Sequence, residues 1–353
     1  MHSPELTSAL ELLFSGDESN TELARALGKS QNLPVEEYYQ KAWKAIQFIN
    51  AYDSTDNTFE YFFTYIKEAT FCIVGEDWVE MPEGFDIIAP FFVNLDIDDI
   101  SVLPDWFKLF KNVVSISSTN TAPKVLPDWL FELEHLKNLR IKIPAGSKIP
   151  SNLKNLKNLE TLYLGFVNKF ESIGDLSGLK KLTSLELYCE VDMYDAAGNY
   201  VSKREQTICS LADAVLEYPK LTNLSISCNT ILHLKKQLAF KLPKLEELTL
   251  NSTSKKLRPH LLFKDSLKLK TLRLNFSNEQ DIVPELWDWL KTLSKLVTIE
   301  LTVPAKTAIP ENLFQHKHLE SVNISGAEYS RYKSAKLIAE AKKHSPSAYF
   351  YIY

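Results

Sequence analysis

The sequence predicts an α/β solenoid, in which short repeats that each contain one strand and one turn stack on one another. Of the leucines, 10 fall in residues 1–125, 38 in residues 126–301 and 3 in residues 302–353. They also keep a fixed phase, because one set of five apolar residues recurs 23 residues later. The first set is Leu130, Leu133, Leu136, Leu139 and Ile141, and it recurs as Leu153, Leu156, Leu159, Leu162 and Leu164. Each unit has two apolar faces, which only stacked neighbours can bury.

The two halves of the repeat predict different local structures. A spacing of three residues favours a helical or 3₁₀ turn with one apolar side, and the alternation that follows favours a short strand with one buried face. Proline opens the turn at Pro104, Pro127 and Pro150, because it lacks an N–H and has a fixed φ angle. One buried residue anchors each expected strand: Cys72, Leu95, Ile116, Leu139, Leu162, Leu185, Leu224, Leu248, Leu272, Ile299 and Val322.

These anchors predict about 10–12 irregular repeats over residues 66–353. A helical stretch around Lys336–Lys343 and a strand at Ala348–Tyr353 are expected to close the array. The step of 39 residues from Leu185 to Leu224 predicts an inserted loop near residues 188–207. Its Ala196-Ala-Gly-Asn199 turn between β-prone flanks predicts a hairpin.

Residues 1–65 have a different pattern and are expected to form a helical N-terminal cap. Ser3 and Pro4 are a helix start, and Gly16 is a stop signal. A second helix is expected over Ser19–Gly28 and a third over Val35–Tyr52. Because the end of a solenoid exposes its core, a cap is expected there. An independent helical module that binds a partner is the alternative.

One unit carries a complete family signature. The stretch Leu221–Ile231 has the pattern LxxLxLxxNxL, and with its proline starts the array resembles the 23-residue LPxxLxxLxxLxxLxL repeats of intracellular and bacterial leucine-rich-repeat proteins. The resemblance implies a curved solenoid with parallel strands on the concave face and turns or helices on the convex face. The asparagine column of the family is present only at Asn229. The local curvature is therefore not predictable.

Composition excludes several classes of function. Lys and Arg total 40 against 45 Asp and Glu, which gives a net charge of -5 and argues against nucleic-acid or anionic-membrane partners. The 10 glycines form no phosphate-binding GxGxxG or P-loop motif. The four cysteines have no CxxC spacing, and no signal sequence or membrane span is recognisable. A cytoplasmic location is expected.

No catalytic constellation is recognisable, so we expect no enzymatic activity, no cofactor and no metal. The pair His316 and His318 is expected to be solvated polar surface. The carboxylates of Asp96, Asp98 and Asp99 are expected to form a solvated rim.

A partner surface is expected on the concave face, where the residues that alternate with the buried leucines project. Aromatic and arginine side chains are favoured in such surfaces. The candidates are Asp96, Arg140, Lys142, Tyr163, Phe166, Glu186, Tyr188, Arg273, Phe276 and Glu300. The inserted loop adds Asp192, Tyr194, Asn199 and Tyr200.

The sequence therefore predicts a non-enzymatic scaffold that presents its concave surface to a protein or peptide partner. The alternative is a targeting or regulatory subunit of a larger enzyme or sensor assembly whose catalytic part is on another chain. A monomer is expected, and dimerisation through the edge strand Ala348–Tyr353 stays open because that strand has no charge or proline.

Overall fold

The computed structural model describes residues 3–53, 58–66, 70–75, 78–118, 123–143, 150–167, 176, 178–190, 209–211, 216–228, 232–234, 240–252, 258–276, 282–305, 307–310, 312–326 and 331–352. The chain divides into two compact units, Met1–Leu139 and Arg140–Tyr353. The division of the chain at residues 65 and 66 stays a prediction.

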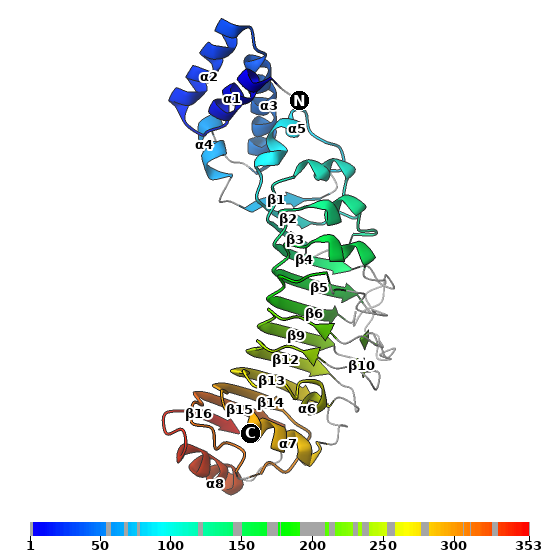
Figure 1. Cartoon of the computed structure of the whole chain (residues 1–353), viewed down its shortest axis with the longest axis vertical. Coiled ribbons are helices and arrows are strands. Elements are labelled where there is room, and N and C mark those ends of the chain that lie inside the picture. Colours follow the sequence, from blue (N-terminus) through cyan, green and yellow to red (C-terminus); the bar gives the residue numbers. More distant parts are fainter. Residues whose placement is uncertain are drawn as a thin grey trace. The chain divides into compact units, whose positions relative to one another are not determined.

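The main sheet has twelve strands that follow one another in chain order (Figure 1). From β5 to β15, neighbouring strands are parallel and in the predicted register, with Leu185 between Leu162 and Leu224. This order confirms the predicted α/β leucine-rich-repeat solenoid. The strands are β1 (Thr70–Val74), β2 (Asn94–Asp98), β3 (Ser115–Ser118), β4 (Asn138–Ile143), β5 (Thr161–Val167), β6 (Ser184–Glu190), β9 (Asn223–Cys228), β12 (Glu247–Ser252), β13 (Thr271–Phe276), β14 (Thr298–Thr302), β15 (Ser321–Ser325) and β16 (Tyr349–Ile352).

Helices open the first unit, as predicted. They are α1 (Pro4–Leu13), α2 (Glu18–Gln31) and α3 (Val35–Asp53), followed by two short helices that the sequence pattern did not predict, α4 (Phe59–Tyr65) and α5 (Phe85–Ile88). The backbone N–H of Leu6 donates a hydrogen bond to Ser3 Oγ at 3.2 Å, which confirms the N-cap. Gly16 follows α1 with a φ angle of 84°, a conformation that glycine adopts without strain.

Aromatic side chains fill the core of the first unit. The ring centroids of Phe14 and Phe63 lie 4.9 Å apart, and each lies 5.1 Å from that of Phe91. Phe91 belongs to the 3₁₀ helix η2 (Ala89–Phe91), directly before β2. Ring pairs of this kind add about 0.5–1.5 kcal/mol beyond their area burial. The helices and the first repeats of this unit therefore share one core.

The expected anchor of the first strand was wrong by one residue. Phe71 lies beside Leu95 and Ile73 beside Ile97, both buried, whereas Cys72 lies beside Asp96 and is exposed. A shift of one residue moves every side chain of a strand to the other face. Burial of Phe71 and Ile73 removes more apolar surface from water than burial of Cys72, which explains the observed register.

Three proline-initiated turns of the repeats have the predicted 3₁₀ conformation. The helices η3 (Asp105–Leu109), η4 (Asp128–Glu132) and η5 (Ser151–Asn155) begin directly after Pro104, Pro127 and Pro150. Their leucine or phenylalanine side chains lie against the buried face of the strands, as shown by the full burial of Phe107, Leu130 and Leu153. The apolar residues that are spaced three apart thus form the inner side of the turn.

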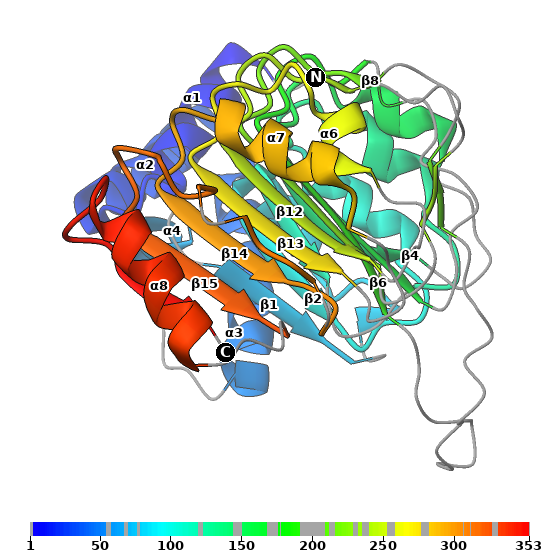
Figure 2. The ribbon, with the colours of Figure 1, turned by 90° about the horizontal axis from the view of Figure 1, so that it is seen from below.

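Leucines form the core of the second unit, and helices replace some of its turns. These are α6 (Pro259–Leu262), α7 (Pro284–Thr292) and α8 (Arg331–Lys342), the last of which covers the expected helical stretch. Figure 2 shows α6 and α7 along one side of the sheet. Two small parallel pairs join β7 (Cys209–Leu211) to β10 (Leu232–Leu234) and β8 (Leu216–Glu217) to β11 (Phe240–Lys241). β16 ends the sheet beside β15, which confirms the predicted terminal strand.

Within the described part of the chain, no helix combines the length and the apolar composition that a membrane span requires.

Candidate functional site

The side chains that alternate with the buried apolar residues from Arg140 of β4 to β16 form a surface that we call the open face. The alternation is regular: in β14 and β15 the second and fourth residues are buried, and the first, third and fifth are partly exposed. Register places these residues in rows across the strands, for example Tyr163 beside Glu186 and Glu186 beside Ser225. Rigid neighbouring strands therefore set the spacing of every side chain on this face.

Arg140 and Tyr163 stack on each other at one end of the open face. The guanidinium carbon of Arg140 lies 4.1 Å from the centroid of the Tyr163 ring. The Tyr163 side chain is 9% exposed, while Arg140 remains exposed above it. A cation–π contact at an exposed site contributes about 0.5–1 kcal/mol. The contact holds the arginine in place while its side chain stays exposed to a partner.

Gly165 gives the Tyr163 ring its space, and the sequence interpretation missed it. A Cβ atom at Gly165 would lie 3.3 Å from Tyr163 Cε1 and 3.2 Å from Lys142 Cγ. Tyr188 is its register partner on β6. A glycine inside a strand often marks a close approach of neighbouring groups, so this signal was present in the sequence. We call Arg140, Lys142, Tyr163, Glu186 and Tyr188, which surround this glycine, the Arg140 cluster.

The phenol of Tyr163 is held in its neutral form. Burial raises the pKa of this group above its ordinary value, Glu186 and Tyr188 raise it further, and Arg140 lowers it in part. A neutral phenol can both donate and accept a hydrogen bond. The Arg140 cluster thus combines donors, an acceptor carboxylate and two aromatic rings.

A second group of predicted residues lies further along the open face. Arg273 Nε and Glu300 Oε1 form an ion pair at 3.1 Å, with both side chains about two-fifths exposed, at 42% and 43%. β9 and β12 separate this pair from the Arg140 cluster. An exposed pair of this kind adds little stability, about 0–1 kcal/mol. The two side chains can therefore rearrange on partner binding at a small cost in free energy.

Hydroxyl and amide side chains cover the strands between and beyond these two groups. Asn251 Nδ2 donates to Ser227 Oγ at 3.3 Å, and the hydroxyls of Thr302 and Ser325 lie 3.0 Å apart. These residues occupy one row, in register across β9, β12, β14 and β15. The row is uncharged and offers both donors and acceptors.

Two predicted contact residues are buried and do not belong to the open face. Phe166 is 1% exposed and Phe276 is 3% exposed. Each stands two positions after a buried leucine, Leu164 and Leu274, and therefore points into the core in the period-2 alternation of a strand. Their assignment as partner contacts was wrong.

The remaining candidates belong to the first unit or lie outside the described residues. Asp96 is partly exposed on β2 of the first unit. The candidates of the inserted loop, Asp192, Tyr194, Asn199 and Tyr200, and the expected hairpin lie outside the described residues.

His316 is not the solvated surface residue that the sequence interpretation expected. It is 6% exposed, and its Nε2 lies 3.0 Å from the carbonyl oxygen of Leu290. His318 is exposed, as expected. In the described residues, no group of three or more His, Cys, Asp or Glu side chains could hold a metal ion.

Comparisons with known proteins find distant similarity to solved structures. No known family model and no curated protein matches this sequence. A leucine-rich-repeat protein of Leptospira interrogans is 15% identical in sequence over 81% of this chain and 78% of its own length, with a TM-score of 0.47. The leucine-rich repeat domain of the type III effector XopL is 15% identical over 91% of this chain and 90% of its own, with a TM-score of 0.35. The fold assignment rests on the strand order and the repeat register of the chain itself.

Proposed function

We propose, from the leucine-rich-repeat fold of this chain, that its open face binds a protein or peptide partner and that the chain has no catalytic activity of its own. The observation that carries the proposal is the Arg140 cluster, in which an exposed arginine is stacked on a buried tyrosine beside the partly exposed Tyr188. Arginine and tyrosine are the residue types that most often dominate binding energy at protein interfaces.

Preorganisation supports the same proposal. Ordering a flexible arginine on binding costs about 0.5–1.5 kcal/mol, and much of that cost is already met in the folded protein by the stacking on Tyr163. A standard interface buries about 800 Å² on each partner, and with strands about 4.8 Å apart five or six strands of the open face offer enough area.

The chemistry of the open face favours a polar protein surface or an extended peptide. Its uncharged row of hydroxyl and amide groups can pair with main-chain N–H and C=O groups of a partner. The Arg273–Glu300 pair adds one charge of each sign, which favours a partner with matching charges in register.

Two further parts of the sequence interpretation belong to this proposal. The cytoplasmic location is supported by the dispersed cysteines, which suit a reducing compartment. The alternative role, a targeting or regulatory subunit for a catalytic chain, also requires that the open face bind a partner. It differs only in what that partner does.

The test compares partner capture by two matched double variants of the full chain. In the first, Arg140→Glu and Tyr188→Ala reverse one charge and remove one ring on the open face, and Tyr163 is left intact because it is buried. In the second, Lys264→Glu and Leu261→Ala make the same kinds of change at exposed positions in and just after α6. A photo-crosslinking residue placed at position 188, and at 261 as its control, identifies which surface the captured protein touches.

The proposal expects the open-face variant to lose the partner by about ten-fold in affinity or more, with unchanged unfolding behaviour, and the α6 variant to keep it. Crosslinks should form from position 188 and not from 261. Equal capture by both variants, or crosslinks only from 261, would exclude the open face as the binding surface.

A further inference from the structure

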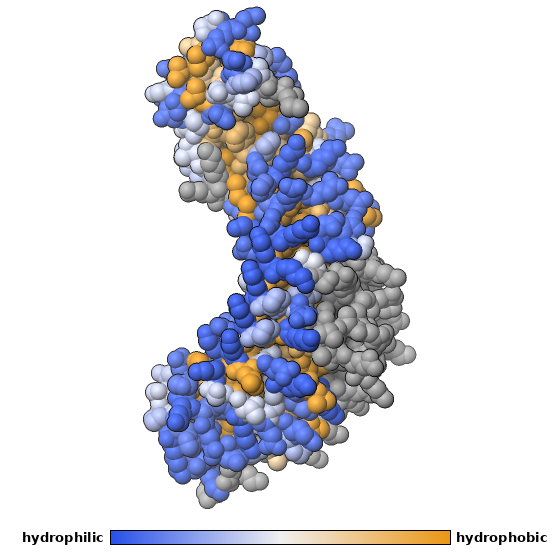
Figure 3. Space-filling view, in the orientation of Figure 1, coloured by the Kyte–Doolittle hydropathy of each residue, from blue (hydrophilic) through white to orange (hydrophobic). Residues whose placement is uncertain are grey.

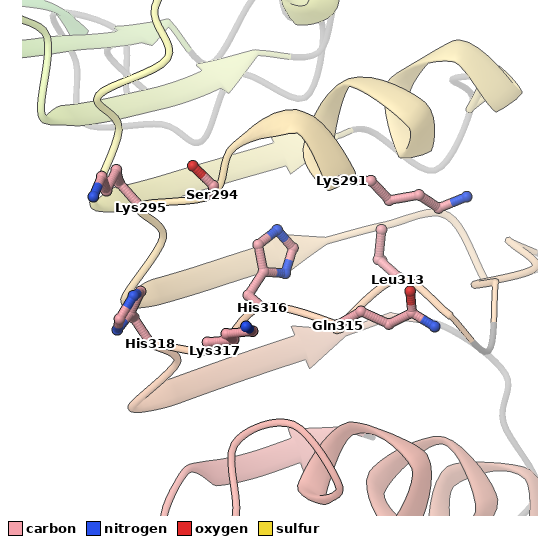
Figure 4. A pocket seen from close by; sticks show the side chains of 8 residues that line it. All are labelled: Lys291, Ser294, Lys295, Leu313, Gln315, His316, Lys317 and His318. Atoms are coloured by element: carbon pink, nitrogen blue, oxygen red, sulfur yellow. The ribbon is translucent and has the colours of Figure 1, made fainter.

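A basic pocket lies away from the open face, between the turns that precede β14 and β15 (Figure 4). Its volume is about 420 Å³. Six polar side chains line it: Lys291, Ser294, Lys295, Gln315, Lys317 and His318. Every one of them can donate a hydrogen bond, and no carboxylate is among the lining residues. The pocket is therefore suited to an anion.

The positive charge of this pocket is only partly neutralised. Lys291 Nζ is paired with Asp288 Oδ1 at 3.2 Å. Lys295 and Lys317 are exposed and form no ion pair with any residue that the structure describes. The pocket therefore offers about two uncompensated positive charges, the number that a doubly charged anion requires.

The buried His316 also lines the pocket and has an unpaired nitrogen. Its Nε2 faces the carbonyl oxygen of Leu290, which can only accept a hydrogen bond, so Nε2 carries the proton in the neutral ring. Its Nδ1 is buried and has no hydrogen-bond partner among the described residues. Buried polar atoms are usually paired, so this nitrogen is an unsatisfied acceptor in the wall of a pocket whose other polar side chains can donate.

The same pocket occurs a second time in the chain, with different chemistry. Seven repeats earlier, a pocket of about 440 Å³ is lined by Lys108, Lys111, Asn112, Trp129, Glu132, Leu133, Glu134 and His135. By repeat position, Glu132 corresponds to Gln315, Leu133 to His316 and Glu134 to Lys317. The two lysines of the earlier pocket are balanced by its two glutamates. The repeat geometry thus produces the hollow, and the sequence makes only the later one strongly basic.

A row of exposed lysines leads to the basic pocket along the edge where the strands begin. Its members stand four residues before register-matched core residues: Lys181, Lys220, Lys244, Lys268, Lys295 and finally His318. Backbone hydrogen bonds of 2.8–2.9 Å link these turns from repeat to repeat, for example Glu246 N to Thr222 O and Glu320 N to Val297 O. In Figure 3 the corresponding margin is mostly hydrophilic. Successive members lie about 4.8 Å apart along the sheet.

We propose that the basic pocket binds a phosphoryl group carried by a protein partner, and that the lysine row receives acidic residues next to it. This inference rests on the proposed function in that the ligand is a protein, but it uses a different surface. A phosphoryl group carries a charge of about -1.5 to -2 at neutral pH and three strong acceptor oxygens, which match the six side chains of the lining that can donate. A single carboxylate would leave one lysine uncompensated.

A protein ligand is favoured over a single-stranded nucleic acid by what the lysine row lacks. Binding of bases depends on aromatic side chains on which they stack. In the described turns 178–183, 217–222, 241–246, 265–270, 292–297 and 315–320, no phenylalanine, tyrosine or tryptophan side chain is exposed. The net charge of -5 likewise opposes a long polyanion.

The first experiment titrates the full chain with inorganic phosphate, against chloride at equal ionic strength, and follows the histidine ring signals by NMR. His318→Asn and His316→Leu assign the two signals of interest. The proposal expects saturable shifts of these two signals and their loss in the Lys295→Ala/Lys317→Ala variant. The matched control, Lys108→Ala/Lys111→Ala in the earlier pocket, should retain the shifts. Absence of saturable shifts in the wild-type chain would overturn the proposal.

The second experiment identifies the source of the phosphoryl group. Fluorescence polarisation compares one glutamate-rich peptide with its central serine phosphorylated or not, a 5′-phosphorylated RNA oligonucleotide, and vesicles that contain phosphatidic acid. The phosphorylated peptide should bind about ten-fold tighter than its unphosphorylated form and tighter than RNA or vesicles, and the pocket variant should remove that difference. Equal binding of both peptides, or tighter binding of RNA or vesicles, would overturn the protein partner.

Failure of this inference and failure of the proposed function are distinguishable. The Arg140→Glu/Tyr188→Ala variant changes only the open face and should bind phosphate as the wild type does. If that variant loses phosphate binding, the pocket is not an independent site. If phosphate binding fails while the open-face variant loses a captured partner, only the pocket inference is excluded.

Discussion

His316 shows how much one side chain in a repeat can deviate from its column. Most equivalent positions carry a buried apolar residue: Phe110, Leu133, Leu156, Leu179, Leu242 and Leu293. The imidazole of His316 occupies that space and hydrogen-bonds to the carbonyl oxygen of Leu290. The backbone carbonyl oxygen of His316 accepts a hydrogen bond from Ser345 Oγ at 2.6 Å. One histidine thereby links three successive repeats through polar contacts. The equivalent residues of the other repeats place His316 in a core column, whereas a solvated surface position was expected from the sequence.

Burial makes His316 a source of pH-dependent stability. Burial lowers the pKa of the imidazole below its ordinary value, and the hydrogen bond to Leu290 opposes this in part. The unfolded chain then binds more protons than the folded chain below about pH 6.5, so the free energy of unfolding should fall as the pH is lowered through that value. Urea unfolding at pH 7.5 and 5.5 measures the loss in the wild type and in His316→Leu.

The leucine variant retains the apolar packing of the column and removes the titrating group. It should therefore lose less stability than the wild type between the two pH values. An identical loss in both proteins would assign the pH dependence to other groups, such as His260, whose pKa burial also lowers.

At the scale of the element, the exit of each strand imposes conditions that the leucine pattern does not contain. Gly326 follows β15 directly and has a φ angle of 86°. A Cβ atom at this position would lie 2.2 Å from the carbonyl oxygen of Val303 in the neighbouring repeat. The chain passes so close to its neighbour here that only glycine fits. The alternation predicted the strand, whereas its exit is determined by the adjacent repeat.

Replacing this glycine should weaken the C-terminal repeats. We expect Gly326→Ala to lower the free energy of unfolding by about 2 kcal/mol or more, because it combines an unfavourable φ angle with a backbone clash. Glu320→Ala, at an exposed position just before the same strand, is the control and should change stability by less than about 0.5 kcal/mol. Chemical denaturation of both variants measures the difference. Equal stability of Gly326→Ala and the wild type would contradict the close approach.

The terminal element β16 has one paired and one outer edge in the sheet, and its Tyr349 and Tyr351 are exposed. The sequence predicted both its strand conformation and its terminal place. Dimerisation through this edge stays a proposal, because it requires a second chain that pairs with the outer edge of β16.

At the scale of the whole molecule, the helical block and the first repeats cannot be separated without exposing core. A Cβ atom at Gly84, at the start of α5, would lie 2.1 Å from the carbonyl oxygen of Lys41 in α3. The Phe14, Phe63 and Phe91 rings join helices to repeat in one aromatic cluster. These contacts support the cap over the alternative of an independent helical module.

Deletion of residues 1–55 should therefore destabilise the first repeats. It removes α1, α2 and α3 and leaves the aromatic cluster open to water, so we expect a protein that aggregates or unfolds without cooperativity. Static light scattering and thermal unfolding by circular dichroism measure this. A monomeric, cooperatively unfolding deletion variant with reduced partner binding would instead support the independent module.

The net charge of the whole molecule also does not reveal where positive side chains gather on its surface. The net charge of -5 argued against nucleic-acid or anionic-membrane partners, yet the turns of the second unit align lysines into one row. The lysines are about 24 to 39 residues apart in sequence, so no short motif reveals them. Only the register of the strands makes them neighbours.

The sequence by itself determined the class of fold, the phase of the strands after the first and the places where proline opens a turn. These features are local: the spacing of Leu153, Leu156 and Leu159 and the φ angle of Pro150 act within a few residues. The tertiary structure alone decided that Phe71 and not Cys72 is buried and that Arg140 stacks on Tyr163. The physical reason is that each of these outcomes depends on the packing of a neighbouring repeat about 23 residues away, which the local pattern does not contain.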